Sequence, residues 1–414
     1  MDWRTLEFRR THLYVTEGHS GSVSFWNEVP DLSRLEPRTR LLDCSGRLVT
    51  RSFGNAHHHV YSALARGMPP PPKQPKNFYE ILKLIWWRLD KALDLEMIEA
   101  SALATAVACA KNGVTFVVDH HASPFAVEGS LETIAKAFDR VGVSHLLCYE
   151  LSDRDGEEVR ERGLAETEHY LRSGRQGLVG LHASFTVGEE LLQRAVELAE
   201  RFETGIHIHV AEDPIDEEQT LKTYGQRVLE RLWETGALHR SKTILAHGLH
   251  LDQKERALFR KSAAFLVENV ESNWNNNVGV FRAEGLGKRL LLGTDGMHSD
   301  MLRSARAAFW VGRAENTSPA EIYARFRKIH TYLSENHFKG DGENNLVILN
   351  YDSPTEISAA NFLSHFIYGI ESRHVESVIS GGNLIFHKGH ILTVDESEVL
   401  RFAREQAQRL WRKL

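Results

Sequence analysis

The feature that most constrains the fold is an alternation of short apolar runs with longer amphipathic segments through the middle of the chain. The segments 101–111, 189–202 and 217–234 carry apolar residues three and four positions apart, a spacing typical of helices. Strands that alternate with helices favour parallel βα units, and eight such strands close into a (β/α)8 TIM barrel. A doubly wound open sheet is the alternative. The eight predicted strands are 53–59, 114–120, 144–149, 178–183, 205–211, 243–247, 264–267 and 290–294.

Both ends of the chain lack this alternation and favour a small β domain built from the two termini. Residues 1–50 form its first part, with strands expected at 11–15, 21–26 and 40–43. Residues 341–395 form its second part, where Gly381-Gly382 predicts a hairpin between two strands. We therefore expect a composite β-sandwich domain beside a barrel at 51–340. Segment 396–414 has one apolar stripe and predicts a C-terminal helix docked on the barrel or on a second subunit.

An aromatic segment follows the first predicted strand. Four prolines at 69–72 form a semi-rigid spacer, and 77–87 is a predicted helix rich in aromatic side chains. Packing in the core or between subunits is the simpler interpretation. The alternative is a lid that supplies aromatic walls to a pocket at the barrel mouth.

Composition excludes several classes of function. A net charge of −6 gives no electrostatic reason to bind nucleic acid or an anionic membrane, so a small molecule is the expected partner. The three cysteines are scattered without a CxxC pair, which predicts no disulfide framework. The charged N-terminal segment is unlike a signal peptide, and no run approaches the ~20 apolar residues of a membrane span. We expect a cytoplasmic protein.

Side chains that bind metals gather at the ends of the predicted strands. His57 and His59 are two positions apart, so on a strand both imidazoles face the same side. His209, His247 and Asp295 end three other strands, and active sites of barrels lie at the C-terminal ends of strands. Three histidines and an aspartate suit zinc or ferrous iron with room for a water, whose pKa the metal would lower from about 16 to near 7. The run 178–183 contains no lysine to bridge two ions, which favours one metal and hydrolytic chemistry.

Each of these residues taken alone fits an ordinary structural role. His207 lies deeper in its strand than His209 and fits a core histidine. Glu212 could be an acidic residue favoured at the start of the next helix, and Asp295 could be a turn residue. The argument for a site depends on their recurrence at successive strand ends.

Several motifs together resemble one known family. They are Asn55-Ala56-His57-His58-His59, His209-Val210-Ala211-Glu212, Ala246-His247-Gly248, Ser272-Asn273 and Gly293-Thr294-Asp295-Gly296. The chain resembles, over most of its length, the metal-dependent amidohydrolase superfamily in its deaminase and chlorohydrolase branch, and there the SsnA-like aminohydrolases. It differs from the family pattern at 268–271, where Glu-Asn-Val-Glu replaces the common His-Asn-Pro.

The resemblance implies roles for individual residues. His57, His59, His209 and Asp295 match the ligands of one divalent metal, with Zn²⁺ expected and Fe²⁺ as the alternative. Glu212 matches the proton-shuttling acid/base, His247 matches the residue that polarises water and substrate, and Asp295 relays protons as well. The residues expected to contact substrate are Arg66, Trp86, His121, His182 and Asn275.

These roles predict a hydrolase that releases ammonia from a purine-like or pyrimidine-like heterocycle and that assembles as a homo-oligomer, a dimer. Loss of chloride, or opening of a cyclic amide, at the same metal centre is the nearest alternative. A catalytically silent relative that binds a nucleobase is the non-enzymatic alternative, although keeping Glu212 argues against it. Nucleic-acid editing is not expected, because that chemistry uses a P-C-x-x-C element that this chain lacks.

Overall fold

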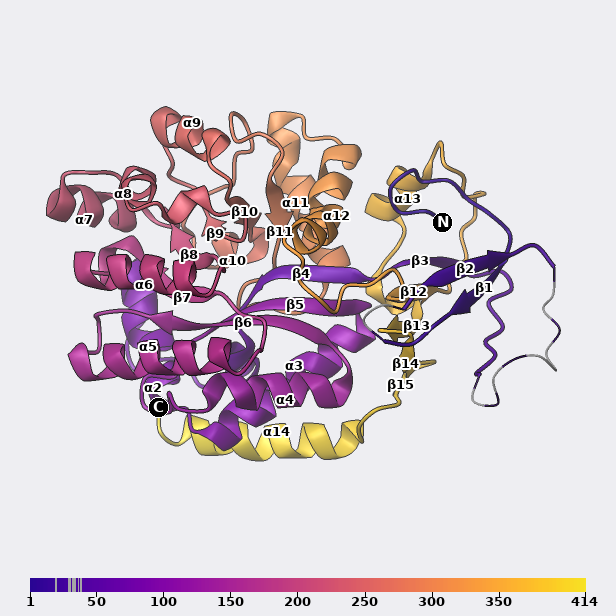
Figure 1. The fold of residues 1–414 in the computed structure, drawn as a ribbon, viewed down its shortest axis with the longest axis horizontal. Helices are drawn as coiled ribbons and strands as arrows, with labels where there is room; N and C mark the ends of the chain where they lie inside the picture. Colours follow the sequence, from indigo (N-terminus) through magenta and orange to yellow (C-terminus); the bar gives the residue numbers. More distant parts are fainter. Residues whose placement is uncertain (19–20, 29–30, 32–34, 36, 38) are drawn as a thin grey trace.

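Eight parallel strands form a closed barrel at the centre of the protein (Figure 1). The computed structural model describes residues 1–18, 21–28, 31, 35, 37 and 39–414. Each barrel strand pairs with the next one in sequence, and the backbone amides of Thr294 and Asp295 donate to the carbonyl of His57 at 3.1 and 3.0 Å, which joins the last strand to the first. The strands are β4 (Phe53–His58), β5 (Val114–His121), β6 (Ser144–Leu151), β7 (Val179–Ala183), β8 (Ile206–Val210), β9 (Ile244–His247), β10 (Phe265–Glu268) and β11 (Leu290–Leu292).

Helices surround the barrel and bury its outer face, so the predicted TIM barrel is confirmed (Figure 1). The main apolar core lies between this ring and the strands, and a smaller one fills the barrel interior with side chains such as Phe116 and Leu291. The helices are α3 (Leu95–Lys111), α4 (Ser130–Val141), α5 (Glu157–Arg172), α6 (Glu189–Arg201), α7 (Pro214–Tyr224), α8 (Val228–Glu234), α9 (Gln253–Lys261), α10 (Val270–Asn275), α11 (Met301–Gly312) and α12 (Pro319–Glu335).

Two predicted helix boundaries are wrong. The segment 217–234 is not one helix, because Gly225 adopts a left-handed conformation (φ 70°) that ends α7, and α8 begins three residues later. The segment 101–111 is the second half of a longer helix, since Asp94 caps α3 by accepting a hydrogen bond from the amide of Met97 at 3.0 Å. In both cases a single capping residue sets the helix boundary, and the spacing of apolar residues does not reveal its position.

A second sheet is built from both ends of the chain, as predicted. It is antiparallel, in the order β15-β14-β13-β12-β3, and Gly381 and Gly382 (φ 55° and 82°) form the expected hairpin turn. The strand expected at 40–43 is wrong, because that segment is irregular and 63% of Leu41 is exposed. Leu48–Arg51 (β3) pairs with β12 in its place. The remaining strands are β12 (Leu346–Leu349), β13 (Val375–Ser380), β14 (Asn383–His387), β15 (His390–Ile391) and the separate pair β1 (His12–Val15) and β2 (Val23–Trp26).

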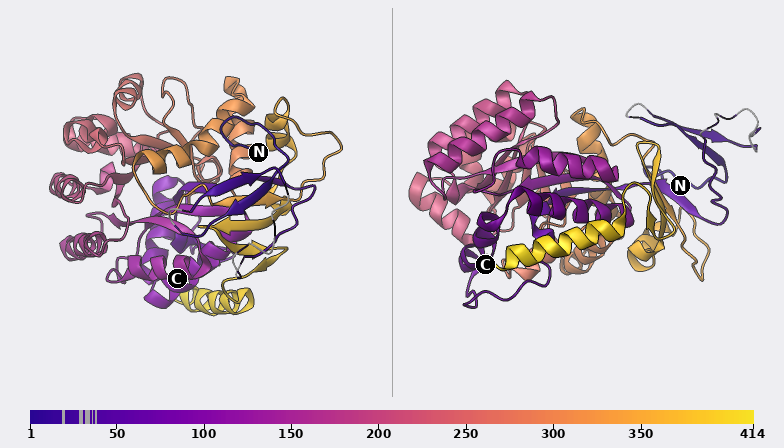
Figure 2. Two further views of the ribbon diagram at one scale, coloured as in Figure 1. Left: turned by 45° about the vertical axis from the view of Figure 1, so that its right-hand side comes forward. Right: turned by 90° about the horizontal axis from the view of Figure 1, so that it is seen from below.

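The helix α14 (Glu396–Trp411) lies along α3 on the outside of the barrel (Figure 2). The indole Nε1 of Trp411 donates to the carbonyl of Leu64 at 2.8 Å, so the apolar stripe is used within the chain. A short helix, α13 (Phe362–Tyr368), packs on α11 and α12. Within the described part of the chain, no helix is both long and apolar enough to cross a membrane.

The aromatic segment folds as α1 (Phe78–Ile81), a π-helical turn (Leu82–Trp86) and α2 (Trp87–Ala92). Asn77 caps its start by accepting from the amide of Glu80 at 2.9 Å. A π-helical turn rotates the residues after it relative to a regular helix, and such turns are frequent at functional sites. Phe78, Leu82, Trp86 and Asp90 all reach one cavity at the barrel mouth, so this segment forms a wall of that cavity.

Candidate metal centre and active site

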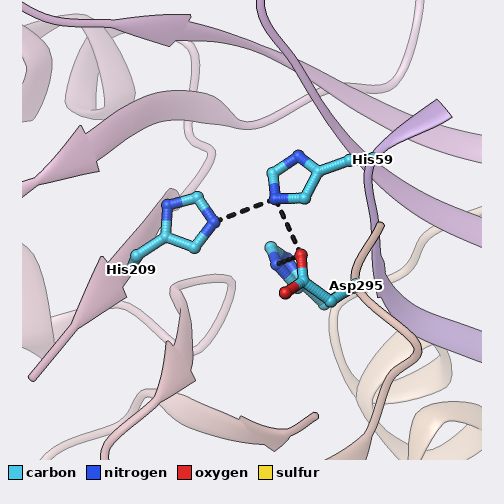
Figure 3. Close-up of side chains that lie close together, drawn as sticks. His59, His209 and Asp295 are labelled. Atoms are coloured by element: carbon cyan, nitrogen blue, oxygen red, sulfur yellow. Dashed lines mark hydrogen bonds and ion pairs between the residues drawn. The ribbon is translucent and has the colours of Figure 1, made fainter. Parts of the chain in front are cut away.

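Three histidines and one aspartate meet at the C-terminal end of the barrel (Figure 3). The Nε2 atom of His59 lies 3.1 Å from Nε2 of His209 and 2.9 Å from Oδ1 of Asp295, and Nε2 of His57 lies 3.4 Å from the same oxygen. His57 and His59 come from the end of β4, His209 from β8, and Asp295 follows β11. The barrel thus brings together four side chains that are separated by up to 238 positions in sequence, since Asp295 follows His57 by that number.

The far side of each imidazole is fixed by a hydrogen bond. Nδ1 of His59 donates to the carbonyl of His120 at 2.7 Å, and Nδ1 of His209 donates to the carbonyl of His182 at 2.8 Å. Nδ1 of His57 hydrogen-bonds to Nε2 of His207 at 2.9 Å. When Nδ1 carries the proton, the lone pair on Nε2 points inward. This is the orientation that metal-binding histidines adopt.

The inward atoms lack partners that would satisfy them. Among the described residues, Nε2 of His57 is buried without a hydrogen bond. The Nε2 atoms of His59 and His209 face each other, so at most one of them can carry a proton, and Nε2 of His59 also lies against the carboxylate of Asp295. Buried polar atoms without partners are costly in a native protein. A cation between them resolves the conflict, so the four residues fit a divalent metal by geometry and by donor type.

The protonation equilibria of His57, His209 and Asp295 suit a metal, and that of His59 shows that the site attracts positive charge. Burial opposes ionisation of His59, but Asp295 raises its pKa to about 9, so a cation is favoured beside that carboxylate. Burial lowers the pKa of His57 to about 3 and that of His209 well below its usual value, so both imidazoles are neutral at pH 7. Burial opposes ionisation of Asp295, but His59 and His57 hold the pKa of that carboxyl well below its usual range. Metal binding requires neutral imidazoles and ionised carboxylates.

Glu212 and His247 lie beside the four-residue cluster. Nε2 of His247 is 3.6 Å from Oε2 of Glu212 and 3.9 Å from Oδ2 of Asp295, and it is buried without a hydrogen bond. Nδ1 of His247 donates to Oδ1 of Asn273 at 2.7 Å, which fixes the ring. Burial, opposed by His247, raises the pKa of Glu212 to about 7, so this carboxyl can accept and return protons near neutral pH.

Backbone strain marks the same strand ends. Ala211, His247 and Asp295 have φ values of 46°, 76° and 52°, a left-handed region that is unfavourable for residues other than glycine. Such conformations cluster at functional sites, where the surrounding structure holds them in place. Here they turn the chain sharply at three strand ends and direct His247 and Asp295 into the mouth.

The mouth opens into a cavity lined by aromatic side chains and a few polar groups, the composition of small-molecule sites. His59, His209, Glu212 and Asp295 form its floor, and aromatic side chains from the segment 78–87 form one wall. The cavity is also lined by Tyr61, Phe185, Asp90, Glu150, Arg154, Asp213 and Asp216.

The predicted substrate residues divide into two groups. Trp86, His182 and Asn275 line the cavity. Arg66 does not: it is exposed at the end of the helical turn that follows His59, where the chain leaves the mouth. His121 is buried behind the wall, packed edge-on against Tyr61 and Tyr149 and hydrogen-bonded to Oγ of Ser123 at 2.9 Å.

Sequence reasoning missed the charged residues of the wall. Glu150 lies near the end of β6 and Arg154 in the turn after it, and a carboxylate one position beyond the predicted strand 144–149 was the available signal. Asp90 shares one helix face with Phe78, Leu82 and Trp86, a spacing of four that extends the aromatic stripe. Ser272, which donates to Asp295, lies in a motif noted above but without an assigned role.

The departure from the family pattern at 268–271 has a structural explanation. Glu268 is buried and pairs with Nη1 of Arg325 at 2.8 Å. Glu271 binds Nε2 of His298 at 2.5 Å and Nε of Arg303 at 2.7 Å. These carboxylates connect the end of β10 to the helices outside it and do not line the cavity.

Comparison with known proteins identifies the family. The profile of the amidohydrolase family matches residues 48–325, which span the barrel. The chain belongs to the amidohydrolase family. This confirms the resemblance inferred from the motifs.

Relatives and solved structures agree with this assignment. A 5'-deoxyadenosine deaminase from Methanopyrus kandleri is 28% identical over 378 residues, covering 86% of this chain and 85% of that protein. A 5-methylthioadenosine/S-adenosylhomocysteine deaminase from Pyrococcus furiosus is 28% identical over 388 residues, covering 88% and 89%. The structure of atrazine chlorohydrolase from Arthrobacter aurescens, complexed with zinc, superposes with a TM-score of 0.80 at 14% identity, covering 95% and 94%, and shows the same fold.

The predicted reaction class is thereby confirmed. The protein is a metal-dependent hydrolase of the deaminase type, which acts on carbon–nitrogen bonds other than peptide bonds.

Proposed function

We propose that this protein is a zinc-dependent deaminase that hydrolyses the exocyclic amino group of an adenine-type purine. The observation that carries the proposal is the convergence of the inward Nε2 atoms of His57, His59 and His209 on the carboxylate of Asp295, with Glu212 and His247 beside them. Two relatives named as deaminases of adenine nucleosides favour the purine. The aromatic wall suits a planar ring.

In this proposal His57, His59, His209 and Asp295 hold the metal. A divalent ion at such a site supplies a Lewis acid that lowers the pKa of a water to about 7. Zn²⁺ is the best match to three imidazoles and one carboxylate with a position left for water, and Fe²⁺ is the alternative.

The protons are moved by residues of the chain. Glu212 takes a proton from the attacking water as its oxygen adds to the ring carbon that bears the amino group, and delivers it to the adjacent ring nitrogen. With Nδ1 donating to Asn273, His247 in its imidazolium form donates from Nε2 to the oxygen that adds to the ring and stabilises the negative charge on it. A second proton passes through Asp295 to the amino group. The carbon–nitrogen bond then breaks, leaving a ring carbonyl and ammonia.

Replacement of Glu212 by Gln tests this assignment. The amide keeps the size of the side chain but cannot shuttle protons, so ammonia release should fall by about 10²- to 10⁴-fold while metal content stays near that of the wild type. Glu218→Gln is the matched control, because Glu218 is exposed on α7 outside the cavity. A Glu212→Gln enzyme with wild-type turnover would disprove the role of Glu212.

A substrate panel tests the leaving group. Ammonia should be released from adenine nucleosides, and chloride release from chlorinated triazines should be slow or undetectable. Efficient chloride release without ammonia from any purine or pyrimidine would replace deamination by the chlorohydrolase alternative.

A further inference from the structure

The cavity is strongly acidic although it must hold a substrate. Among the described residues that line it, one cationic side chain, Arg154, faces a set of six carboxylates: Asp90, Glu150, Glu212, Asp213, Asp216 and Asp295. Burial raises the pKa values of Glu212 and Asp216 to about 7, so each carries only part of a charge at pH 7, but a divalent metal together with Arg154 still leaves the cavity with a net negative charge. An anionic substrate would enter against this field.

The charge of Arg154 is already fully used. Its guanidinium forms an ion pair with Asp90, lies 3.4 Å from Oε1 of Glu150 and contacts Oδ2 of Asp155 through Nε at 3.2 Å. Its Cζ atom also lies 5.2 Å from the centre of the Trp87 ring. Three carboxylates therefore compensate the charge of Arg154, although its Nε and Nη1 atoms have no hydrogen-bond partner among the described residues.

Two carboxylates of the wall have no cationic partner of their own. Asp216 accepts from the backbone amides of Ala211 and Phe185 at 2.8 and 3.1 Å. Asp213 caps α7 and accepts from the amide of Ile215 at 3.0 Å. Neutral backbone donors satisfy hydrogen bonds without supplying a positive charge to either carboxylate.

An unpartnered acceptor lies in the same wall. Asp90 is 1% exposed, and its Oδ1 atom has no hydrogen-bond partner although its other oxygen pairs with Arg154. Burial raises the pKa of Asp90 to about 6, against the opposing effect of Arg154, so the group is mostly ionised at pH 7. A buried ionised oxygen without a donor favours a ligand that brings an N–H group or a positive charge.

Aromatic rings complete this part of the cavity. Trp86 and Trp87 line the wall next to Asp90, and Tyr61 and Phe185 are also in the lining. The faces of such rings attract cations, and aromatic walls combined with carboxylates are the usual surroundings of bound ammonium groups. Resting on the proposed function, we infer that the substrate carries a cationic nitrogen group in addition to the ring that is deaminated, held between Trp86 and the unpartnered Oδ1 atom of Asp90.

Three probes that differ mainly in charge test this inference at pH 7. They are 5'-amino-5'-deoxyadenosine (cationic), 5'-deoxyadenosine (neutral) and adenosine 5'-monophosphate (anionic). We expect kcat/KM for the amine to exceed that of the neutral nucleoside by about tenfold or more, the scale of one charge-assisted hydrogen bond, with the phosphate lowest. Calorimetric affinities for the Glu212→Gln protein should follow the same order without turnover.

Two variants assign the preference to the wall. Asp90→Asn should reduce the preference for the amine over the neutral probe to about threefold or less. Since loss of the Arg154 partner could unfold this variant, Asp213→Asn is the second test: Asn caps a helix as well as Asp does, so only charge is removed, and the preference should fall with the melting temperature unchanged. Glu218→Gln should keep the full preference.

The outcomes separate this inference from the proposed function. Ammonia release from all three probes with equal kcat/KM and equal calorimetric affinities would overturn the inference and leave deamination intact. Preference for the phosphate would overturn it as well. No ammonia from any probe, with the calorimetric order preserved, would reject the proposed purine substrate and support the cation site.

Discussion

Two buried polar clusters lie near opposite ends of the first barrel strand, and they differ in how their atoms face one another. The ligand cluster at the C-terminal end consists of His57, His59, His209 and Asp295. The joint cluster, where the β domain meets the barrel, consists of Arg51, Arg327, His330 and Asp341.

In the joint cluster, opposite charges meet. Nη2 of Arg51 lies 3.2 Å from Oδ2 of Asp341, and Nδ1 of His330 lies 2.9 Å from the same oxygen. Nη1 of Arg327 donates to the carbonyls of Arg51 and Ser52 at 3.1 and 2.8 Å. Donors face acceptors in these contacts, so opposite charges hold the joint together, although Nε and Nη1 of Arg51 and Oδ1 of Asp341 have no hydrogen-bond partner among the described residues.

In the ligand cluster, three imidazole Nε2 atoms and one carboxylate converge, and they can share fewer protons than they have acceptor positions. The Nε2 atoms of His59 and His209 are 3.1 Å apart with their Nδ1 protons already committed to backbone carbonyls. Burial alone does not distinguish the two clusters. The two clusters differ in whether cationic side chains face the carboxylate, as they do in the joint cluster. This difference implies that the ligand cluster is the one that requires a cation.

The largest expected effect comes from removing one ligand. His209→Ala should lose bound metal and reduce ammonia release by roughly a thousandfold or more. Loss of a residue that only orients a ligand typically costs about 10- to 100-fold in metal affinity or activity, so the loss of a ligand itself should exceed that range. Metal content by elemental analysis and the ammonia assay measure this.

His58 provides the matched control for that variant. It is 3% exposed but points away from the ligands, with Nε2 3.1 Å from Oγ of Ser299. His58→Gln should keep about one metal per chain, since no ligand atom is removed. Metal loss in His58→Gln equal to that in His209→Ala would mean that packing of β4, and not ligation, determines metal binding.

Asp341→Asn should break the joint cluster without affecting the metal. It leaves Arg51 and His330 buried without their shared carboxylate, and breaking a buried pair in this way costs about 3–5 kcal/mol of unfolding free energy. Urea denaturation measures the loss, and metal content should stay unchanged. Parallel loss of metal would show that the two clusters are coupled through β4.

The fold was largely predictable because its main signal is periodic. All eight barrel strands were located to within about two residues, since buried parallel strands are continuous apolar runs. The misplaced strand at 40–43 and the split helix at Gly225 depend on long-range pairing and on a single left-handed residue, which periodicity does not encode.

The candidate site was predictable only in part. His57, His59, His209 and Asp295 recur at strand ends, and the barrel rule brings such positions together. Asp90 and Arg154 come from a helix and a loop whose placement over the mouth depends on tertiary packing. Arg66 is near His59 in sequence, but the helical turn between them carries the chain away from the mouth.

A smaller effect is expected one layer behind the ligands, at His207. Its Nε2 lies 2.9 Å from Nδ1 of His57, so it orients that imidazole. His207→Phe removes the acceptor at similar volume and should weaken metal binding by about 10- to 100-fold. His207→Gln can retain a carbonyl acceptor and should lose less. Competition with a chromogenic chelator measures both affinities, and equal losses would indicate packing instead of orientation.

The smallest expected effect is an acid-dependent loss of stability at the joint cluster. Burial opposes ionisation of Asp341, but His330 and Arg51 lower its pKa from 3.8 to about 2. A depressed carboxyl pKa stabilises the fold fully above the unfolded-state value, and this contribution disappears as pH falls from about 4 to 2. It corresponds to about 2 kcal/mol.

Urea denaturation at pH 5, 4 and 3 measures this contribution in the wild type and in Asp341→Asn. Because Asn does not titrate, the difference in unfolding free energy between the two proteins should shrink as pH falls. The ligand cluster cannot produce this difference, since both proteins retain it. A constant difference from pH 5 to 3 would mean that the pKa of Asp341 is the same in the folded and unfolded protein, so that the ion pairs of the joint cluster do not stabilise its charge.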